Sequence, residues 1–172
     1  MHTTHNPLPV AVISSGPSAA AGLLGRVLGG TVTELTPYDL AMERCGVQSW
    51  RAVVVENFTP PIPGALDPCS AARWLIPRRG LAVVNGDDPA GRRFARQDGV
   101  FSWSDGDDRA DLTAKNINLR WGRLEFDALA HNELTRVRLP AETDVYAALA
   151  ALSCAVGLGM PLEEAARRLA VG

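Results

Sequence analysis

Several features that would define a functional class are scarce or missing in this sequence. Basic residues are not in excess, since 17 Lys and Arg stand against 19 Asp and Glu and the net charge is -2 at pH 7. This balance gives no electrostatic footprint for nucleic acid or an anionic membrane, and we expect neither as a partner. No apolar run approaches the roughly 20 residues that span a bilayer. Because the N-terminus also lacks the basic start and apolar core of a signal peptide, the sequence predicts a cytoplasmic protein.

Cysteine is sparse as well. The three cysteines, Cys45, Cys69 and Cys154, lie far apart in the sequence. Their spacing contains no zinc-type pair, and an odd number does not indicate a disulfide framework. We therefore expect buried thiols in a reducing compartment. Internal repeats and low-complexity tracts are also missing, which argues against a solenoid or a disordered linker.

The length and composition predict one folded domain. A chain of 172 residues with 47% hydrophobic and 21% charged residues can bury a substantial core. We place the domain at residues 10–172 and a flexible tail at residues 1–9. His2 and His5 in this tail could bind a metal adventitiously, but a frayed terminus explains them more simply.

The first half of the chain alternates apolar strands with helical segments. Residues 10–13 form a fully apolar stretch that is typical of a strand in the middle of a parallel sheet. A helix is predicted over Ser18–Leu28, ended by Gly29-Gly30. Further strands are predicted at residues 31–35, 52–55 and 80–85, with short helices over Pro37–Cys45 and in residues 69–76. This alternation predicts a three-layer α/β fold with a mainly parallel sheet.

The pattern changes near residue 100. The segments "VFSWS", "LTAKNINLRWG", "RLEFDAL" and "TRVRLP" are short and are separated by glycines or polar turns. They predict an antiparallel meander or separate hairpins that extend the sheet at one edge. From Thr143 the sequence turns helical, with one helix to about Val156 and a second, "LEEAARRLA", after a turn at Gly157–Pro161.

The order of these segments resembles the central, ATP-binding domain of the Mur ligases, which add amino acids to the peptidoglycan precursor. "VNGDDP" and "GLGMPLEEAARRLA" are the most specific parts of the resemblance, which extends from Gly80 to the C-terminus. It implies a P-loop-like topology, with ATP and magnesium as cofactors. If the chain is an enzyme, the resemblance implies an ATP-dependent carboxylate–amine ligase. The family's N- and C-terminal domains have no counterpart here, and we expect a degenerate, stand-alone relative.

The phosphate-loop position of the family departs most from its pattern. Family members carry a Gly-Lys-Thr loop, and spacing puts Gly16-Pro17-Ser18 there, after Ser14 and Ser15. Pro17 has neither a positive charge nor a backbone N–H, so two anion-binding elements are missing together. Ser14, Ser15, Gly16 and Ser18 are therefore candidates for a vestigial nucleotide site. The Ser18 hydroxyl could ligate magnesium or cap the following helix.

The metal-binding positions of the family are only partly kept. Glu56 matches the family glutamate that helps to hold magnesium, and with Ser18 it is a candidate metal ligand; otherwise it is a solvated acid at a strand end. The family lysine, which is often carbamylated, falls on Ala72 with Arg73 adjacent. Arginine cannot be carbamylated into a metal ligand.

The nucleotide-contacting asparagines of the family are also replaced. Asp144 and Ala147 stand at these positions, and Ala147 cannot contact an adenine edge. Asp144 is a vestigial candidate, or simply an acid in the first helical turn with Thr143 as its cap. Asp87 and Asp88 in "NGDDP" are kept, and turn formation before a proline explains them.

Two classes of function remain, and we assign no catalytic residue. The first is a non-catalytic module that binds a protein partner or a second copy of itself, through the proline-rich residues 59–68 or exposed tryptophans. Core packing is the alternative for each tryptophan, and we expect it for at least two of Trp50, Trp74, Trp103 and Trp121. The second is a component of an ATP-dependent amide ligase that another chain completes. A site for another small molecule at the carboxyl edge of the sheet is a third possibility.

Overall fold

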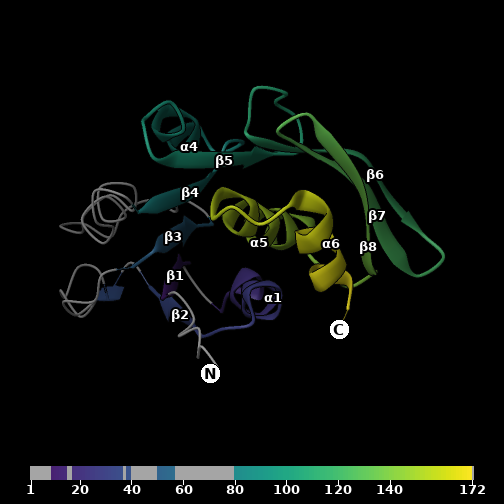
Figure 1. The fold of residues 1–172 in the computed structure, drawn as a ribbon, viewed down its shortest axis with the longest axis horizontal. Helices are drawn as coiled ribbons and strands as arrows, with labels where there is room; N and C mark the ends of the chain where they lie inside the picture. Colours follow the sequence, from purple (N-terminus) through teal and green to yellow (C-terminus); the bar gives the residue numbers. More distant parts are fainter. Residues whose placement is uncertain (1–8, 15–16, 37, 40–49, 57–79, 172) are drawn as a thin grey trace, which may run out of the picture.

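The computed structural model describes residues 9–14, 17–36, 38–39, 50–56 and 80–171. These residues form an eight-stranded sheet in the order β2-β1-β3-β4-β5-β6-β7-β8, with helices against it (Figure 1). The strands are β1 (Val10–Ile13), β2 (Val32–Leu35), β3 (Ala52–Val55), β4 (Leu81–Asn85), β5 (Val100–Ser104), β6 (Leu112–Arg120), β7 (Arg123–Ala130) and β8 (Glu133–Pro140). The helices are α1 (Ala19–Leu28), α4 (Pro89–Phe94), α5 (Val145–Gly157) and α6 (Leu162–Ala170).

The sheet is parallel over most of its width. Strands β1 to β5 pair in parallel, and β6 joins β5 in parallel through Trp103↔Leu112 and Ser104↔Thr113. Strands β6, β7 and β8 form an antiparallel meander. The predicted mainly parallel α/β fold with a small antiparallel extension is therefore confirmed.

Successive side chains of a strand point to opposite faces of the sheet, and in the inner parallel strands β1 and β3 both faces are buried. Val10 and Val12 pack in one core with residues of α1, α5 and α6, whereas Ala11 and Ile13 pack in a second core on the other face. Phe94 of α4 belongs to this second core, and Figure 1 shows α4 on the side of the sheet away from α1. The elements thus form three layers, as predicted.

Helix α1 has the ends that its sequence indicates. The Ser18 hydroxyl accepts the backbone N–H of Ala21 at 3.0 Å, so Ser18 is the N-cap. Gly29 adopts φ 65° and donates its N–H to the Gly25 carbonyl, which closes the helix in the left-handed conformation that glycine favours. Of the two roles considered for the Ser18 hydroxyl, the structure shows helix capping.

Helix α5 lies in the middle of the molecule. All residues from Ala147 to Val156 are buried, and all except Ser153 are apolar, so this helix is enclosed on every side. At its end, a Cβ on Gly157 would lie 2.6 Å from the Cδ2 atom of Leu81 and 3.3 Å from the Phe101 ring, so a side chain there would require these two residues to shift. Cys154, three residues before Gly157 in the same helix, has the expected buried, free thiol.

One strand differs from its prediction. The segment Val100–Ser104 is the parallel strand β5 rather than part of the antiparallel meander. Helix α4 was not predicted; it lies between β4 and β5 and forms the crossover that a parallel return requires. Four of the five residues of β5 are buried, which is typical of an internal parallel strand.

Several predictions fall outside the described residues: the tail at residues 1–8, the rest of the helix at Pro37–Cys45, the loop at residues 59–68 and the helix in residues 69–76. Among the tryptophans, Trp50 (3% exposed) and Trp103 (0%) are core residues, whereas Trp121 is 97% exposed. Core packing for two tryptophans is thus confirmed, and Trp74 lies outside the described part. No helix in the described ranges is long and apolar enough to cross a membrane.

Candidate functional site

The candidate residues converge on the carboxyl edge of the parallel sheet. Ser14 directly follows β1, Glu56 follows β3, and the Gly86–Asp88 turn follows β4. Because parallel strands all end at the same edge, this is where open α/β sheets place their ligands. Helices α1 and α5 also begin at this edge, with Ser18 and Asp144 as their N-caps. Ser15 and Gly16 lie outside the described residues.

The start of helix α1 is bonded to a carboxylate of its own chain. The backbone N–H of Ser18 donates to Oε2 of Glu34 at 3.0 Å. Glu34 lies on β2, paired in register with Val12 of β1, and this register brings its side chain to the start of α1. Ser14 is buried, and its N–H donates to the Leu35 carbonyl at 3.1 Å. The backbone N–H of Ser18, which faces the place where an anion would bind at the start of α1, is therefore already bonded to the Glu34 carboxylate.

Glu56 is held through its backbone. Its N–H donates to the Ile13 carbonyl at 3.2 Å and continues the β1–β3 ladder by one bond, while its side chain is half-buried at the strand end. Within the described ranges, no three His, Cys, Asp or Glu side chains come close enough together to hold a metal ion. Ala72 and Arg73 are not among the described residues.

The "NGDDP" turn is built from hydrogen bonds within the turn and to the end of β5. Asp87 accepts the Ser104 hydroxyl through Oδ1 and the Asp105 N–H through Oδ2 at 2.9 Å. Asp88 caps α4 by accepting the N–H groups of Ala90 at 2.8 Å and Gly91 at 3.3 Å. Both aspartates therefore have the structural, turn-forming role that the sequence predicts.

Gly86 in the same turn allows a close approach of two backbones. Its N–H donates to the Trp103 carbonyl at 2.7 Å, and a Cβ at this position would lie 2.9 Å from that oxygen. A side chain would therefore push β4 and β5 apart at the carboxyl edge.

The start of α5 corrects one assignment. Asp144, not Thr143, is the N-cap, and its Oδ1 accepts the Ala147 N–H at 2.8 Å. The position that corresponds to a family asparagine thus stabilises the helix start. Two residues on, the Tyr146 hydroxyl donates to Oδ2 of Asp105 at 3.0 Å. Partial burial and this neighbouring carboxylate raise the pKa of Tyr146 to about 12.

Glu34, Asp105 and Tyr146 were not predicted to belong to this edge. Glu34 is one polar residue in a short strand, and its contact with Ser18 depends on the β1–β2 register. The Asp105–Tyr146 bond joins residues 41 positions apart. No local pattern in the sequence marks any of the three.

A cavity of about 150 Å³ adjoins the "NGDDP" turn. Three arginines line it, Arg92, Arg96 and Arg109, together with Asp107 and Asp111. One pair of these charges is joined directly: Arg109 forms a two-bond contact with Asp107 at 2.9 and 3.0 Å. These hydrogen bonds lower the pKa of Asp107 to about 2. The charged side chains that line the cavity are thus three arginines and two aspartates, and only one arginine and one aspartate form an ion pair with each other.

Comparisons with known proteins agree with this architecture. No family model matches the chain. In sequence, the chain is 30% identical over 92 residues to UDP-N-acetylmuramate–L-alanine ligase of Clostridium novyi (strain NT). In structure, it matches MurF from Acinetobacter baumannii (TM-score 0.74, 18% identity) and MurF from Thermotoga maritima in complex with ADP (TM-score 0.69, 16% identity).

These matches relate the chain to the Mur ligases by sequence and by fold, and the predicted resemblance is confirmed. The structural matches each cover 97% of this chain but only 46% and 48% of the two MurF chains. The sequence match covers 52% of this chain and 20% of the curated ligase. The chain thus spans about half of its structural relatives and a fifth of that ligase.

Proposed function

We propose that this protein is a non-catalytic relative of the Mur ligase central domain that acts by binding rather than by ligating. The hydrogen bond from the Ser18 N–H to Glu34 carries the proposal. In a phosphate loop, backbone N–H groups at the start of the helix face the anion. Here a carboxylate of the same chain occupies such a donor, and Pro17 offers none.

Electrostatics supports this interpretation. A phosphate at the start of α1 would lie beside the Glu34 carboxylate, and two like charges about 4 Å apart near a surface repel by roughly 1–4 kcal/mol. The phosphate-loop lysine that would offset this repulsion is replaced by Pro17. The described residues at this point therefore fit an internal carboxylate better than a triphosphate.

The base and metal positions support the proposal from other directions. Asp144 uses its carboxylate to cap α5, and Ala147 has no polar side-chain atom with which to recognise adenine. Glu56 is not joined by two further metal-ligating side chains among the described residues. Micromolar nucleotide binding requires about -8 kcal/mol, and few groups remain to provide it.

The alternative is that the chain is one component of an ATP-dependent amide ligase in peptidoglycan or related polyamide synthesis, completed by another chain. Its relation to UDP-N-acetylmuramate–L-alanine ligase and its fold favour this possibility. One structural relative, MurF from Thermotoga maritima, was solved with ADP. Both possibilities place the protein in the cytoplasm.

Isothermal titration with magnesium-ATP separates the two. We expect no binding tighter than roughly 100 µM, because Pro17 stands in place of the phosphate-loop lysine and Ala147 offers no contact to the base. Binding tighter than this that weakens in Glu56→Ala would contradict the proposal and support a ligase component. The same titration should be made with Glu34→Gln, because this variant removes the negative charge of Glu34 without shortening the side chain. A large gain in affinity in this variant would identify Glu34 as the group that excludes the nucleotide.

A further inference from the structure

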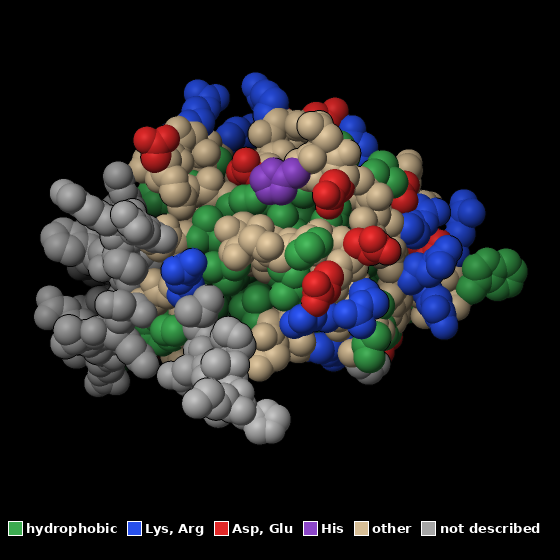
Figure 2. Space-filling model, in the orientation of Figure 1, with side chains coloured by type: hydrophobic (Ala, Val, Ile, Leu, Met, Phe, Trp, Pro, Cys, Tyr) green, Lys and Arg blue, Asp and Glu red, His purple; other side chains and the backbone are tan. Residues whose placement is uncertain are grey.

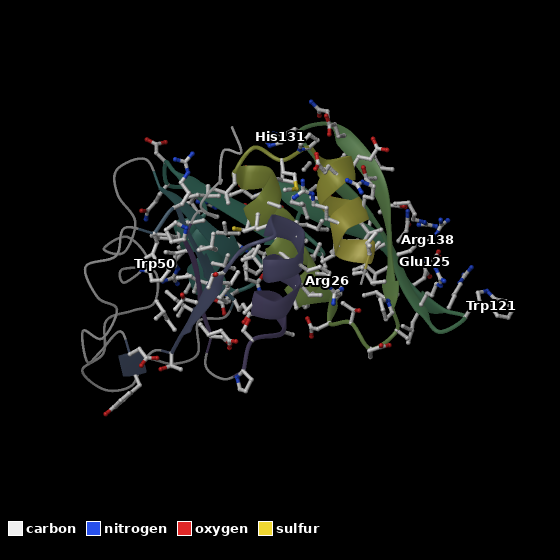
Figure 3. All side chains as sticks on the ribbon, turned by 60° about the horizontal axis from the view of Figure 1, so that its bottom comes forward. Arg26, Trp50, Trp121, Glu125, His131 and Arg138 are labelled. Carbon is white, nitrogen blue, oxygen red and sulfur yellow. The ribbon has the colours of Figure 1, made fainter. Side chains whose placement is uncertain are left out.

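The β6–β7 hairpin ends in a turn that is unfavourable for its sequence. Trp121 and Gly122 form this two-residue turn with φ 54° and 70°, the two positive values that define a type I′ turn. Asn-Gly is the preferred pair there, whereas a bulky residue is disfavoured at positive φ. Trp121 is also 97% exposed and projects away from the molecule (Figure 3). The fold therefore gains neither a good turn nor buried area from this tryptophan.

Two arginines flank the turn and face each other. Arg120 and Arg123 are directly paired across the hairpin, an arrangement in which like charges destabilise the strand pair. Neither has an ion-pair partner among the described residues, whereas Arg136 and Arg138 pair with Glu125 and Asp127 farther along the meander. The positive charge at the turn is therefore not balanced locally.

The preceding strand adds a second exposed apolar side chain. Leu119 is 67% exposed, although its pair across the hairpin, Leu124, is buried. In Figure 2 an apolar side chain is the outermost feature at this end of the molecule, with Lys and Arg side chains directly behind it. We call residues 119–123 the hairpin tip. Its exposed apolar groups, strained turn and like-charge pair have a cost for folding and together indicate a contact outside the chain.

We propose that the hairpin tip inserts into the interface of an anionic lipid bilayer. Tryptophan favours the headgroup level of a membrane, where its ring is half apolar and half polar. Arg120 and Arg123, directly behind it, would then lie at the level of the negatively charged headgroups. The positive charge of the hairpin tip is not visible in the net charge of the chain, which is -2, because the two arginines are a local cluster within a slightly acidic protein.

Size favours a lipid surface over a protein partner. A stable protein interface buries about 800 Å² on each side and uses roughly 20–30 residues. The hairpin tip is a narrow protrusion of five residues, too small for such an interface, whereas a bilayer can close around a single inserted side chain. This contact is independent of nucleotide binding, so its failure and that of the proposed function are separable.

Co-sedimentation with vesicles tests the proposal. We expect the protein to bind vesicles of equal parts phosphatidylcholine and phosphatidylglycerol, but not vesicles of phosphatidylcholine alone. Each arginine near an anionic surface strengthens binding about fivefold, so Arg120→Gln with Arg123→Gln should lower the partition coefficient about 25-fold. Trp121→Asn should lower it at least about tenfold, because it removes the inserted apolar surface. Tryptophan emission should shift to the blue on vesicle binding, and this shift should be lost in Trp121→Asn.

Two matched variants serve as controls. Arg93→Gln removes an exposed arginine of α4, and Leu134→Asn removes a leucine of β8 that is as exposed as Leu119 but lies far from the hairpin tip, opposite Leu129 of β7; both should bind vesicles as the unchanged protein does. Trp121→Asn should fold at least as stably as the unchanged protein, since it creates the preferred Asn-Gly turn. If it does not fold, the double arginine variant, which keeps the turn, provides the test.

Three results would overturn the lipid contact: no binding to anionic vesicles, equal binding to neutral vesicles, or unchanged binding by Trp121→Asn. Sedimentation velocity without lipid tests the alternative that the hairpin tip contacts a second copy of the chain. A mass that rises with protein concentration, and that Trp121→Asn abolishes, would assign the hairpin tip to contact between copies of the chain and would also overturn the proposal.

Discussion

Arg26 and Arg168 each donate a hydrogen bond to the last turn of the other's helix. Arg26 of α1 donates to the Leu169 carbonyl of α6 at 3.4 Å, and Arg168 of α6 donates to the Val27 carbonyl of α1 at 3.2 Å. The last carbonyls of a helix lack partners within it and carry partial negative charge. The two arginines therefore satisfy both helix ends and hold α1 against α6.

Replacement of Arg168 tests this reciprocal contact. Arg168→Ala removes the bond to Val27 and the ion pair with Glu164, and we expect the free energy of unfolding to fall by about 1–2 kcal/mol. Arg167→Ala on the same helix is the control; Arg167 is exposed, so its loss should change stability by less than about 0.5 kcal/mol. Urea denaturation measures both, and equal effects would show that the contact to α1 contributes nothing.

Gly86 in the "NGDDP" turn should not tolerate a side chain. In Gly86→Ala, the new Cβ would meet the Trp103 carbonyl at 2.9 Å, and we expect a loss of about 1–3 kcal/mol of stability. Nothing lies within 4 Å of a Cβ at Gly106, so Gly106→Ala should have little effect. Thermal unfolding of the two variants compares them directly. An unchanged Gly86→Ala protein would mean that β4 and β5 can separate at this edge without cost.

Substitutions at Asp144 and Thr143 test which of these two residues caps the start of α5. Asp144→Ala should lower the free energy of unfolding by about 1 kcal/mol, because the Ala147 N–H loses its acceptor. Asp144→Asn should be nearly neutral, since asparagine caps equally well. Thr143→Ala should also be neutral, and a larger loss there than in Asp144→Ala would restore Thr143 as the cap. Chemical denaturation of the three variants provides the comparison.

The hydroxyl of Tyr146 should lose its proton at a higher pH than an ordinary tyrosine does. Its pKa is raised to about 12 by partial burial and by the Asp105 carboxylate, whereas an unfolded tyrosine titrates near 10. The folded protein thus holds this proton more tightly, so the contribution of Tyr146 to stability is complete below pH 10 and is lost as the pH rises toward 12. Tyr146→Phe should remove the late step from an ultraviolet titration. A normal transition near pH 10 for Tyr146 would contradict the bond to Asp105.

The sequence predicts the parallel half of the fold well because its strands are buried on both faces. Val10–Ile13 and Ala52–Val55 have the predicted bounds, since a run of apolar β-branched residues allows few other structures. The prediction failed for Val100–Ser104, where Ser102 and Ser104 make a buried strand look amphipathic. These serines are buried because they bond to Asp111 and Asp87 respectively, and such long-range partners leave no periodic signal.

The candidate site was predictable only where a motif defines it. Asp87 and Asp88 have the turn-forming roles expected before a proline, and Ser18 caps its helix as serine commonly does. The Glu34 contact was not predictable, because it depends on the register between two short parallel strands. The vestigial nucleotide role of Ser14, Ser15, Gly16, Ser18 and Asp144, and the metal role of Ser18 and Glu56, stay predictions.

The junction between β5 and β6 has a mechanical consequence. The parallel and antiparallel halves of the sheet are joined there through Trp103↔Leu112 and Ser104↔Thr113, while α5 packs on β3, β4, β5 and β6, and α6 packs on β8 and on α5. A pulling force on the meander would thus be resisted mainly by side-chain packing in the helical layer and only slightly by backbone bonds. Amide protons of β7 and β8 should accordingly exchange with solvent as a group, at a rate distinct from that of β1, β3 and β4.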